Sequence, residues 1–558
     1  MVPRDGAPPH AVAEPPPPAH STVYDAIVIG SGLSGAMFAR PLVHAGLRVL
    51  MIERGDWVPQ DLRNREPAGS LELTPFFSAD QTYRTENGRR AAMVRSSSCV
   101  GGAAVFFGGA VLRYREADFD PDPEIVGDSG ACWPIGYEDL EPYYSLTEQA
   151  LDVAGVRHAD RTEPPRSMPY PQVARPLSPV SQRIAAAARN LSLHPSILPL
   201  AINYRGGPRS CVGCDRCDTY ACAVGAKNDP ASRLLPDLLR GGLTLKTNTV
   251  AARFDTSGEE VTGLTCYDRA RNCWVTYRAR IFAVAAGSLA TPHLLLSSGL
   301  DRLNPGGHTV GRYLMRHCNS VVFGVFPRRP NGTGEFHKQL CFFDYYFGHP
   351  SVARPRGKLG VIQQIHPPPP GLVRTLLPFP LNSLACSVIP HMPGLVVIAE
   401  DQPRAENRIT LDHGSVDRYG LPQPVIVHRY TRRDLEARRA LVSAASRILR
   451  RAGAAFCYAR PIETFSHALG TVRMGDDPTT SALDATCRFR GIENLYVVDG
   501  SAMPTSAGVN PSLTLSANAL RVGEHVTATL QAGVDSEQQT GSAHLAGVLG
   551  LRLGHAHP

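Results

Sequence analysis

Residues 24–40 read YDAIVIGSGLSGAMFAR, and residues 48–55 read RVLMIERG. The first stretch begins with a short, nearly continuous apolar run, which is typical of a buried parallel strand. It then passes through a glycine-rich turn into a helical pattern, and the second stretch predicts another strand. Together they predict a strand–helix–strand unit, in which Pro41 should kink or shorten the helix.

The glycine-rich turn, GSGLSG at 30–35, indicates dinucleotide binding. Gly30 and Gly32 permit a tight turn and the close approach of a pyrophosphate, and Gly35 lets the helix pack on the strand. The phosphates would face the helix N-terminus, where free N–H groups and the helix dipole favour anions. Glu53 ends the second strand, where its carboxylate can accept a hydrogen bond from a ribose hydroxyl. This fingerprint does not by itself separate NAD from FAD, but its position at the N-terminus favours FAD.

Length and composition limit the remaining possibilities. A chain of 558 residues is too long for one hydrophobic core, so we expect two domains, interleaved or in series. The formal charge of +7 is spread over scattered Lys and Arg, without a basic run, so no nucleic-acid partner is expected. No apolar stretch is long enough to span a bilayer, so no membrane partner is expected either.

The two ends and the cysteines bear on order and location. Residues 1–21 are rich in Pro, Ala and His, so they predict a disordered lead-in and no secretory signal. Residues 536–558 predict a flexible tail. Without a signal we expect a cytoplasmic protein, and 13 cysteines, an odd count, argue against a disulfide framework.

The pattern along the chain predicts an α/β fold with two interleaved domains. We expect a Rossmann-like cofactor domain from 22–317, with insertions around 56–94 and 200–230, that is completed by residues 456–535. Alternating and aromatic segments within 318–455 predict an antiparallel sheet and hence a substrate domain. A helix at about 432–452 should lead the chain back to the first domain.

Four stretches resemble the glucose-methanol-choline (GMC) flavoprotein oxidoreductases. They are residues 24–40, VGGAAVFFGGAVLR at 100–113, AAGSLATPHLLLSSG at 285–299, and 463–531, which contains SHALGTVRMG and VNPSLTLSAN. The resemblance implies the GMC-type two-domain fold, an FAD cofactor and the oxidation of an alcohol.

The resemblance also implies two catalytic residues. His467 matches the histidine that lies beside the reactive nitrogen N5 of the flavin, and Asn510 matches its His or Asn partner. Oxidation of an alcohol requires loss of the hydroxyl proton, and an imidazole is a natural acceptor near neutral pH. A neutral amide can hold the substrate oxygen without competing for that proton.

A cofactor-binding set follows from the same resemblance. Phe106 stands where some family members carry a histidine bonded to the flavin, so we expect FAD to be bound non-covalently. The expected set is Gly30, Ser31, Gly32, Gly35, Glu53, Arg54, Gly101, Gly102, Phe106, Gly108, Gly109, Val250, Ala286, Gly287, Asp499, Gly500, Asn510 and Pro511.

Four cysteines form a separate cluster, Cys211, Cys214, Cys217 and Cys222. Their spacing could ligate a tetrahedral metal or an iron–sulfur cluster, as in some membrane-linked sugar dehydrogenases of this superfamily. The pattern departs from a ferredoxin run, with four residues before the last cysteine and Ala223 in place of a proline. Structural thiols in an insertion loop are the alternative, which the cysteine spacings of related cytosolic members favour.

One branch of the family is more similar than the rest, the branch that oxidises the primary 6′-hydroxyl of aminoglycoside amino sugars. The similar text is VFFGGAVLRYREADFD at 105–120, VGAKND at 224–229 and AENRITL at 405–411. A polycationic substrate should meet acidic and aromatic side chains, for which the candidates are Asp344, Tyr345, Tyr346, Glu400 and Asp401. Each could instead be a surface acid or a packing aromatic.

We therefore expect a small-molecule alcohol, a sugar or amino sugar, as substrate, and O2 or another molecule as electron acceptor. Two other interpretations stay open. One is an electron-transfer subunit that uses the cysteine cluster, and the other is a lyase in which the flavin is structural.

Overall fold

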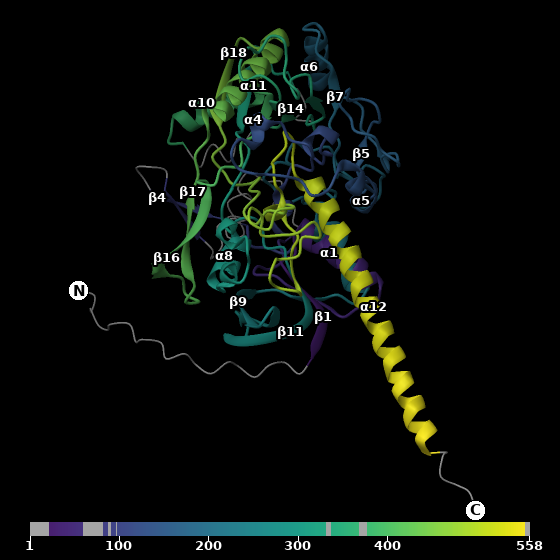
Figure 1. Ribbon diagram of the computed structural model, residues 1–558. Helices are drawn as coiled ribbons and strands as arrows, with labels where there is room; N and C mark the ends of the chain where they lie inside the picture. Colours follow the sequence, from purple (N-terminus) through teal and green to yellow (C-terminus); the bar gives the residue numbers. More distant parts are fainter. Residues whose placement is uncertain are drawn as a thin grey trace, which may run out of the picture.

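The computed structural model describes residues 22–59, 82–86, 91–95, 97–330, 336–367 and 377–552. The expected N-terminal tail, residues 1–21, lies outside this range, as does most of the loop-rich stretch expected at 56–94. Figure 1 shows the two ends of the body, with β1 and β11 at one end and α11 and β14 at the other.

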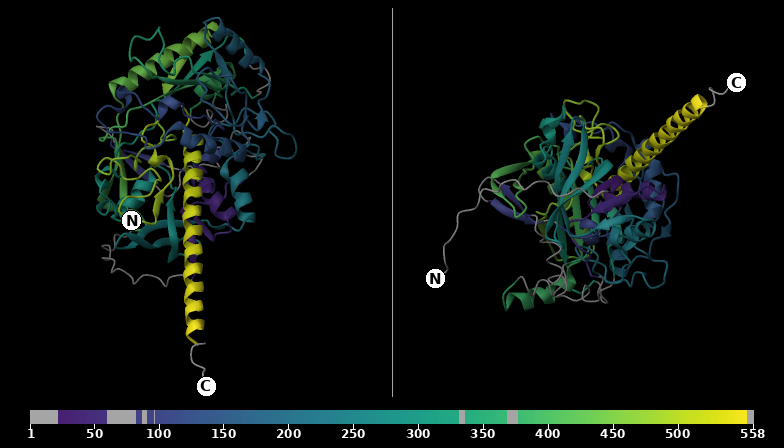
Figure 2. Two further views of the ribbon diagram at one scale, coloured as in Figure 1. Left: turned by 45° about the vertical axis from the view of Figure 1, so that its right-hand side comes forward. Right: turned by 90° about the horizontal axis from the view of Figure 1, so that it is seen from below.

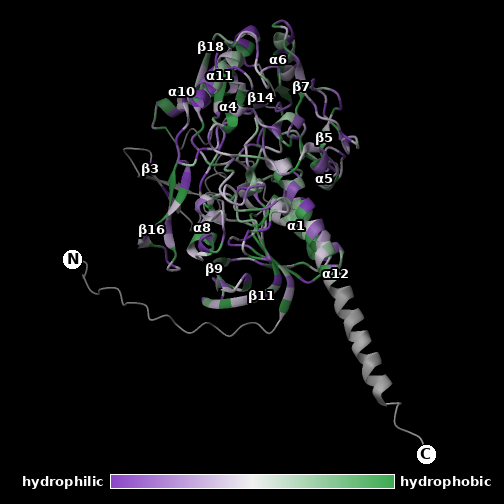
Figure 3. Cartoon of the chain, in the orientation of Figure 1, coloured by the Kyte–Doolittle hydropathy of each residue, from purple (hydrophilic) through white to green (hydrophobic). Residues whose placement is uncertain are grey.

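The first body is built on a seven-stranded sheet within the described residues. Strand order is β8-β2-β1-β11-β10-β9, and β19 pairs with β11. The strands are β1 (Val23–Ile29), β2 (Val49–Ile52), β8 (Thr244–Lys246), β9 (Thr249–Ser257), β10 (Glu260–Asp268), β11 (Cys273–Val284) and β19 (Leu495–Val497). The pairs of β1 with β2 and β11, of β2 with β8 and of β11 with β19 are parallel, so the sequence-predicted Rossmann-like unit is present. Hydrophobic residues line β1 and β11, as expected for strands inside a parallel sheet (Figure 3).

The predicted helix after the glycine turn is α1 (Leu33–His44). Pro41 lies within it and does not end it, because the proline removes one N–H while its own carbonyl still accepts from Ala45 at 2.9 Å. α1 packs against the last helix, α12 (Ser512–Arg552), and α12 also packs against α5 (Tyr137–Ala150).

The second body is a six-stranded sheet of order β18-β12-β15-β14-β13-β7. Its members are β7 (Pro195–Ile197), β12 (Ser320–Val325), β13 (Leu340–Phe342), β14 (Gly360–Ile365), β15 (Gly394–Ala399) and β18 (Phe456–Pro461), and all of their pairings are antiparallel. β7 and β18 lie outside the range 318–455 expected for the substrate domain, because paired strands need not be adjacent in sequence.

The two faces of this sheet bury different cores. Ile362 belongs to the core beneath α6 (Pro179–Arg189) and α11 (Arg432–Arg451). Its neighbour Val361 belongs to the large core that also contains the strands of the first sheet. Because side chains alternate along a strand, Gln363 of β14 shares the face of Val361, directed toward the first body.

A four-stranded sheet of order β16-β17-β3-β4 flanks the body. It contains β3 (Thr82–Glu86), β4 (Ala91–Arg95), β16 (Arg408–Val416) and β17 (Pro422–Val427). Two short strands, β5 (Ala154–Gly155) and β6 (Gln172–Val173), pair with each other. Four further α-helices are α4 (Pro123–Val126), α7 (Leu235–Arg240), α8 (Ala290–Ser297) and α10 (Leu381–Val388).

Residues 536–552, expected to be part of a flexible tail, continue helix α12. No proline occurs between Ser512 and Arg552, so no residue there enforces a break in the helix. The end of the helix projects away from the body in both views of Figure 2.

Candidate active site

The glycine turn and Glu53 form one hydrogen-bonded unit. A carboxylate oxygen of Glu53 accepts from the backbone N–H of Ser31 at 3.1 Å and from its hydroxyl at 2.6 Å. The other oxygen accepts from the N–H of Gly55 at 2.8 Å. Burial raises the pKa of Glu53, while the hydrogen bonds to Ser31 and Gly55 act against that rise. The carboxylate thus braces the turn, and Oε1, which accepts from Gly55, keeps a lone pair for a further donor.

The turn has the shape that a bound dinucleotide requires. Gly30 has φ +104°, and a Cβ there would overlap the carbonyl of Ala285. A Cβ on Gly35 would overlap the carbonyl of Gly30, so this glycine allows α1 to approach β1. Gly32, the N-cap of α1, and Gly287 have open space where a Cβ would stand, and α1 has no side-chain cap. These observations fit a pyrophosphate at the N-terminus of α1.

The segment 97–113 lies over this turn. The N–H of Gly101 donates to the Ser31 hydroxyl at 3.0 Å, and a Cβ on Gly102 would come within 3.2 Å of Gly32. Further along, Gly108 lies against the ion pair of Lys338 with Asp218, and a side chain there would overlap both. Glycines therefore bring this backbone close to the turn and to the ion pair.

Asp499 joins the last part of the chain to the same region. One of its oxygens accepts from the N–H of Gly287 at 2.8 Å and from the hydroxyl of Thr291 at 2.5 Å. The other oxygen accepts from the N–H of Ser501 at 2.8 Å. Gly500 is buried beside this carboxylate, and a Cβ on it would come within 2.8 Å of Leu469.

The remaining predicted cofactor residues are distributed around this cradle. Val250 is buried in β9, Ala286 directly precedes Gly287, and Pro511 is buried at the start of α12. Phe106 lies in a small core with Cys99 and Val105. Gly109 follows Gly108 with φ +76°.

The side chain of Arg54, one of the predicted cofactor residues, lies beside the flanking sheet. Its guanidinium lies 5.7 Å from the ring centre of Tyr419, next to the hairpin of β16 and β17, and its carbonyl accepts from Arg269. Burial lowers the pKa of Arg54. These contacts tie the second strand of the cofactor unit to the flanking sheet.

His467 sits on a loop that is fixed directly after this residue. Leu469 exchanges two backbone hydrogen bonds with Met315, at 3.0 and 2.9 Å. The N–H of Gly470 donates to the carbonyl of Gly500 at 3.0 Å, which joins this loop to the Asp499 segment. Gly470 has φ +86°, and a Cβ on it would lie 2.6 Å from the carbonyl of Tyr313, so only glycine fits.

A second histidine, His317, contacts the imidazole of His467. The two Nδ1 atoms are 3.0 Å apart. The Nε2 atom of His317 lies 3.0 Å from the carbonyl oxygens of both Ser506 and Ala507. Burial, then the neighbouring His317 and Lys338, lower the pKa of His467 from 6.5 to about 3. The imidazole of His467 is therefore neutral at physiological pH, with a lone pair on one ring nitrogen.

Asp401 fixes the backbone at Arg316 and at His317, the histidine that contacts His467. Its carboxylate is buried and accepts from the N–H of Arg316 at 2.8 Å, the N–H of His317 at 3.0 Å and the hydroxyl of Ser506 at 2.9 Å. Burial acts to raise the pKa of Asp401, but the adjacent His428 and His317 hold it below its usual range.

Asn510 lies on the loop 505–510, which precedes α12. Its side-chain oxygen accepts from the amide nitrogen of Gln363 at 2.6 Å. Gln363 is buried in β14, so the antiparallel sheet sets the orientation of the Asn510 amide. With the oxygen engaged, the amide nitrogen of Asn510 is the group left to donate to a substrate.

Two residues that were expected to contact the substrate, Asp344 and Tyr345, bind other groups of the protein. Asp344 accepts from the backbone and lies 2.7 Å from the ring nitrogen of His194, and the hydroxyl of Tyr345 accepts from Arg447 at 3.0 Å. Neither contact leads to His467, so nothing in the described structure brings Asp344 or Tyr345 into the site.

Tyr346 instead supports the Asn510 loop. Its hydroxyl donates to Asp118 at 2.8 Å and accepts from the N–H of Gly508 at 3.1 Å. Asp118 and Glu400 are both fully buried and both pair with Lys358. This buried network lies behind the loop, and Glu400, like Asp401, serves the scaffold.

The four clustered cysteines line one small cavity together with Lys227. The ammonium of Lys227 donates to the carbonyls of Phe107 at 2.7 Å and Tyr220 at 2.6 Å, which ties the cysteine loop to the segment 97–113. In the described part of the chain, no group of three or more His, Cys, Asp or Glu side chains is arranged to hold a metal ion.

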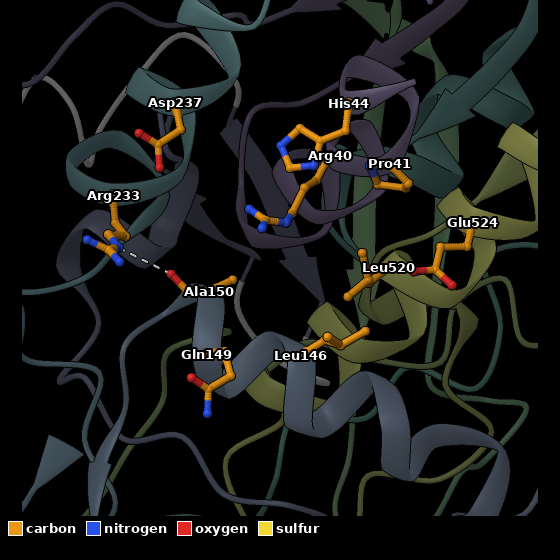
Figure 4. Close-up of a pocket in the computed structure, with 10 residues that line it drawn as sticks. All are labelled: Arg40, Pro41, His44, Leu146, Gln149, Ala150, Arg233, Asp237, Leu520 and Glu524. Atoms are coloured by element: carbon orange, nitrogen blue, oxygen red, sulfur yellow. Dashed lines mark hydrogen bonds between the residues drawn. The ribbon is translucent and has the colours of Figure 1, made fainter. Parts of the chain in front are cut away.

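A cavity of about 400 Å³ opens at the surface between α1, α5, α7 and α12 (Figure 4). Its lining combines cations such as Arg40 and Arg233 with acids such as Asp237 and Glu524. None of the predicted catalytic or cofactor residues lines it, so we do not assign the reaction there.

Three side chains of the site were not predicted from the sequence: His317, Gln363 and Asp401 in its role as a clamp. No local pattern marks His317 or Gln363, because both act on residues that lie more than a hundred positions away. Only the tertiary fold reveals them.

The comparisons with known proteins agree with this fold and site. The GMC oxidoreductase family matches residues 24–319 and 403–519, so the chain belongs to the GMC oxidoreductases. It is therefore an oxidoreductase, as the sequence analysis predicted.

Among characterised relatives, the chain is 33% identical to paromamine 6'-oxidase of Streptomyces fradiae, over 91% of this chain and 92% of that protein. It is 32% identical to 6'''-hydroxyparomomycin C oxidase of Streptomyces lividus, over 91% and 92%. The predicted similarity to aminoglycoside oxidases is confirmed.

Solved structures confirm the fold. Pyridoxine 4-oxidase from Mesorbium loti superposes with a TM-score of 0.64 at 20% identity, over 90% of this chain and 99% of that one. Formate oxidase of Aspergillus oryzae superposes with a TM-score of 0.61 at 15% identity, over 91% and 99%. Among the helices of the described residues, none is both long and apolar enough to cross a membrane.

Proposed function

We propose that this chain binds FAD non-covalently and oxidises a primary hydroxyl of an amino sugar, such as the 6′-hydroxyl of an aminoglycoside, to the carbonyl. The observation that carries the proposal is that two groups are each held by a hydrogen bond, His467 by His317 and the side-chain oxygen of Asn510 by Gln363. Together they match the two needs of an alcohol oxidation, a proton acceptor and a donor to the substrate oxygen.

The residues present fit FAD. The open glycine turn, the helix N-terminus and the Glu53 carboxylate would hold the ADP portion, and the backbone of Gly102, Gly287 and Asp499 would line the path toward His467. When bound, FAD supplies the acceptor for the hydride that leaves the alcohol carbon.

The side chains of this protein handle the proton. His467 accepts the hydroxyl proton as the carbon–oxygen double bond forms. The amide nitrogen of Asn510 donates to the substrate oxygen, where negative charge develops, so it stabilises the transition state more than the ground state.

The proposed substrate class rests on the two aminoglycoside oxidases that the chain resembles over nine-tenths of its length. Tight but non-covalent binding follows from Phe106, whose side chain offers no nucleophile to the cofactor. Precipitation of the purified protein with acid should release the flavin into the supernatant, and flavin that remains with the pellet would contradict this part.

The test is the visible spectrum of the purified, FAD-loaded protein under anaerobic conditions, before and after addition of paromamine. Loss of the flavin band, with recovery on admission of air, supports oxidation of the amino sugar and O2 as acceptor. Loss without recovery supports the same oxidation with another electron acceptor. An unchanged band with paromamine and with neutral sugars would overturn the proposal and favour the lyase.

A further inference from the structure

The hydrogen bonds of His317 determine where its protons lie. Its ring is fully buried, and Nε2 is 3.0 Å from the carbonyl oxygens of Ser506 and Ala507. A carbonyl oxygen can only accept, so Nε2 of His317 must carry a hydrogen. In the neutral ring the other nitrogen, Nδ1, then holds a lone pair.

The same reasoning extends to His467. Its Nδ1 lies 3.0 Å from the Nδ1 of His317, which is hydrogen-bond distance. Two lone pairs cannot share this contact, so the hydrogen between the rings belongs to His467. Its Nε2 is then the nitrogen that carries a free lone pair.

We propose that His317 is a positioning residue, which fixes His467 as the Nδ1–H tautomer and so presents the lone pair of Nε2 to the substrate hydroxyl. The inference rests on the proposed function for the role of His467. In the reaction the substrate O–H bond breaks and an Nε2–H bond forms on His467. His317 gains and loses no proton, and its Nδ1 lone pair stabilises the imidazolium that results.

If His317 instead carried its hydrogen on Nδ1, His467 could not act as the base. A hydrogen on Nδ1 of His317 would take the lone pair of His467 Nδ1, and His467 would then carry its hydrogen on Nε2, where no proton could be accepted. For a neutral His317, the two carbonyls of the 505–510 loop select against this state as long as His317 keeps its place.

The fold holds His317 in that place from several sides. Its backbone has φ +57°, in the left-handed region, and its N–H donates to Asp401. Its carbonyl accepts from the hydroxyl of Tyr430 at 2.8 Å. The other titratable groups around it are Arg316, whose N–H also donates to Asp401, and His428, 3.8 Å from the same carboxylate.

The test is the tautomer itself, measured by nitrogen-15 NMR on the FAD-loaded enzyme with labelled histidine and without substrate. The signals of His467 are assigned by their loss in His467→Gln. We expect the proton on Nδ1 and a bare Nε2. A proton on Nε2 would overturn the proposal, whatever the activity.

Two variants add a functional readout. His317→Asn suits the left-handed backbone and its side-chain oxygen can replace Nδ1 as acceptor, so kcat should stay within about tenfold of the wild type. His317→Leu offers no acceptor, so the bare-Nε2 signal should be lost and kcat should fall by about 10², with KM changed by less than about twofold.

The matched control is His428→Asn, which changes an equally buried histidine beside Asp401 that makes no bond to His467. It should leave the His467 tautomer unchanged. If His317→Leu lowers the melting temperature but keeps the tautomer and kcat, His317 is structural and the proposal is wrong. If Leu prevents folding, the wild-type and Asn spectra still decide. A bare Nε2 in an enzyme whose flavin no alcohol reduces would refute the proposed function and leave the tautomer assignment standing.

Discussion

The hydrogen bond from Gln363 to Asn510 yields a prediction that can be tested by comparing the wild type with two single variants and their double variant. Gln363 is buried, its amide nitrogen is 2.6 Å from the Asn510 oxygen, and Met can fill its volume without a donor. In Gln363→Met the Asn510 amide loses the contact that fixes its orientation, so its nitrogen is no longer held toward the substrate oxygen.

The magnitude follows from the kind of bond that is lost. Asn510 is only partly buried, so the loss is that of a typical hydrogen bond, about 0.5–1.5 kcal/mol. If that cost is expressed in the transition state, kcat/KM falls by about 2- to 13-fold, at 1.36 kcal/mol for each factor of ten. We expect most of the loss in kcat, since the donor acts on charge that develops during the reaction.

The assay is steady-state turnover of the wild type, Gln363→Met, Asn510→Ala and the double variant, all loaded with FAD to the same extent. Because Gln363 acts through Asn510, its substitution should cost less than about twofold once Asn510 is already alanine. Equal losses in both backgrounds would mean that Gln363 acts on the substrate or on stability, and the reasoning would be refuted.

Two further predictions concern the support of the Asn510 loop by Tyr346 and the effect of Lys338 on the pKa of His467. Tyr346→Phe should lower the free energy of unfolding by about 1–3 kcal/mol, because Asp118 loses a buried donor. The control, Tyr345→Phe, should lower it by less than about 1 kcal/mol. Comparable melting curves for the two variants would contradict this prediction. With His317 neutral, the low pKa of His467 keeps its imidazole able to act as base as the pH falls, so kcat/KM should hold below pH 6.5. Lys338→Met, by removing a neighbouring cation, should move the acid limb of the pH profile to higher pH. A limb that stays in place or moves down would show that Lys338 does not act on His467.

The cofactor half of the fold was predictable from local sequence. A short apolar strand, GSGLSG and an acidic residue at the end of the next strand describe contacts made within thirty residues, and the structure has them as β1, α1, β2 and Glu53. The substrate sheet was predicted only as a type, since its outer strands β7 and β18 come from segments outside the expected range.

The candidate site divides in the same way. His467 and Asn510 were predicted from motif resemblance, and their surroundings in the structure give each a defined orientation. Asp344 and Tyr345 were predicted as substrate contacts because composition shows which residue types a segment offers, but composition does not show where a side chain points. The end expected to be flexible contains a helix over 536–552, which the sequence permits because no proline intervenes there.

By itself the sequence predicted the strand, glycine turn and helix of the cofactor cradle, because they depend on short spacings that the backbone imposes locally. Resemblance to the family predicted the chemistry and the two residues proposed to perform it. The tertiary structure alone decided which nitrogen of His467 can accept a proton and which end of the Asn510 amide can donate one. Those properties are set by His317 and Gln363, at sequence separations of 150 and 147 residues, and hydrogen bonds over such distances exist only once the chain has folded.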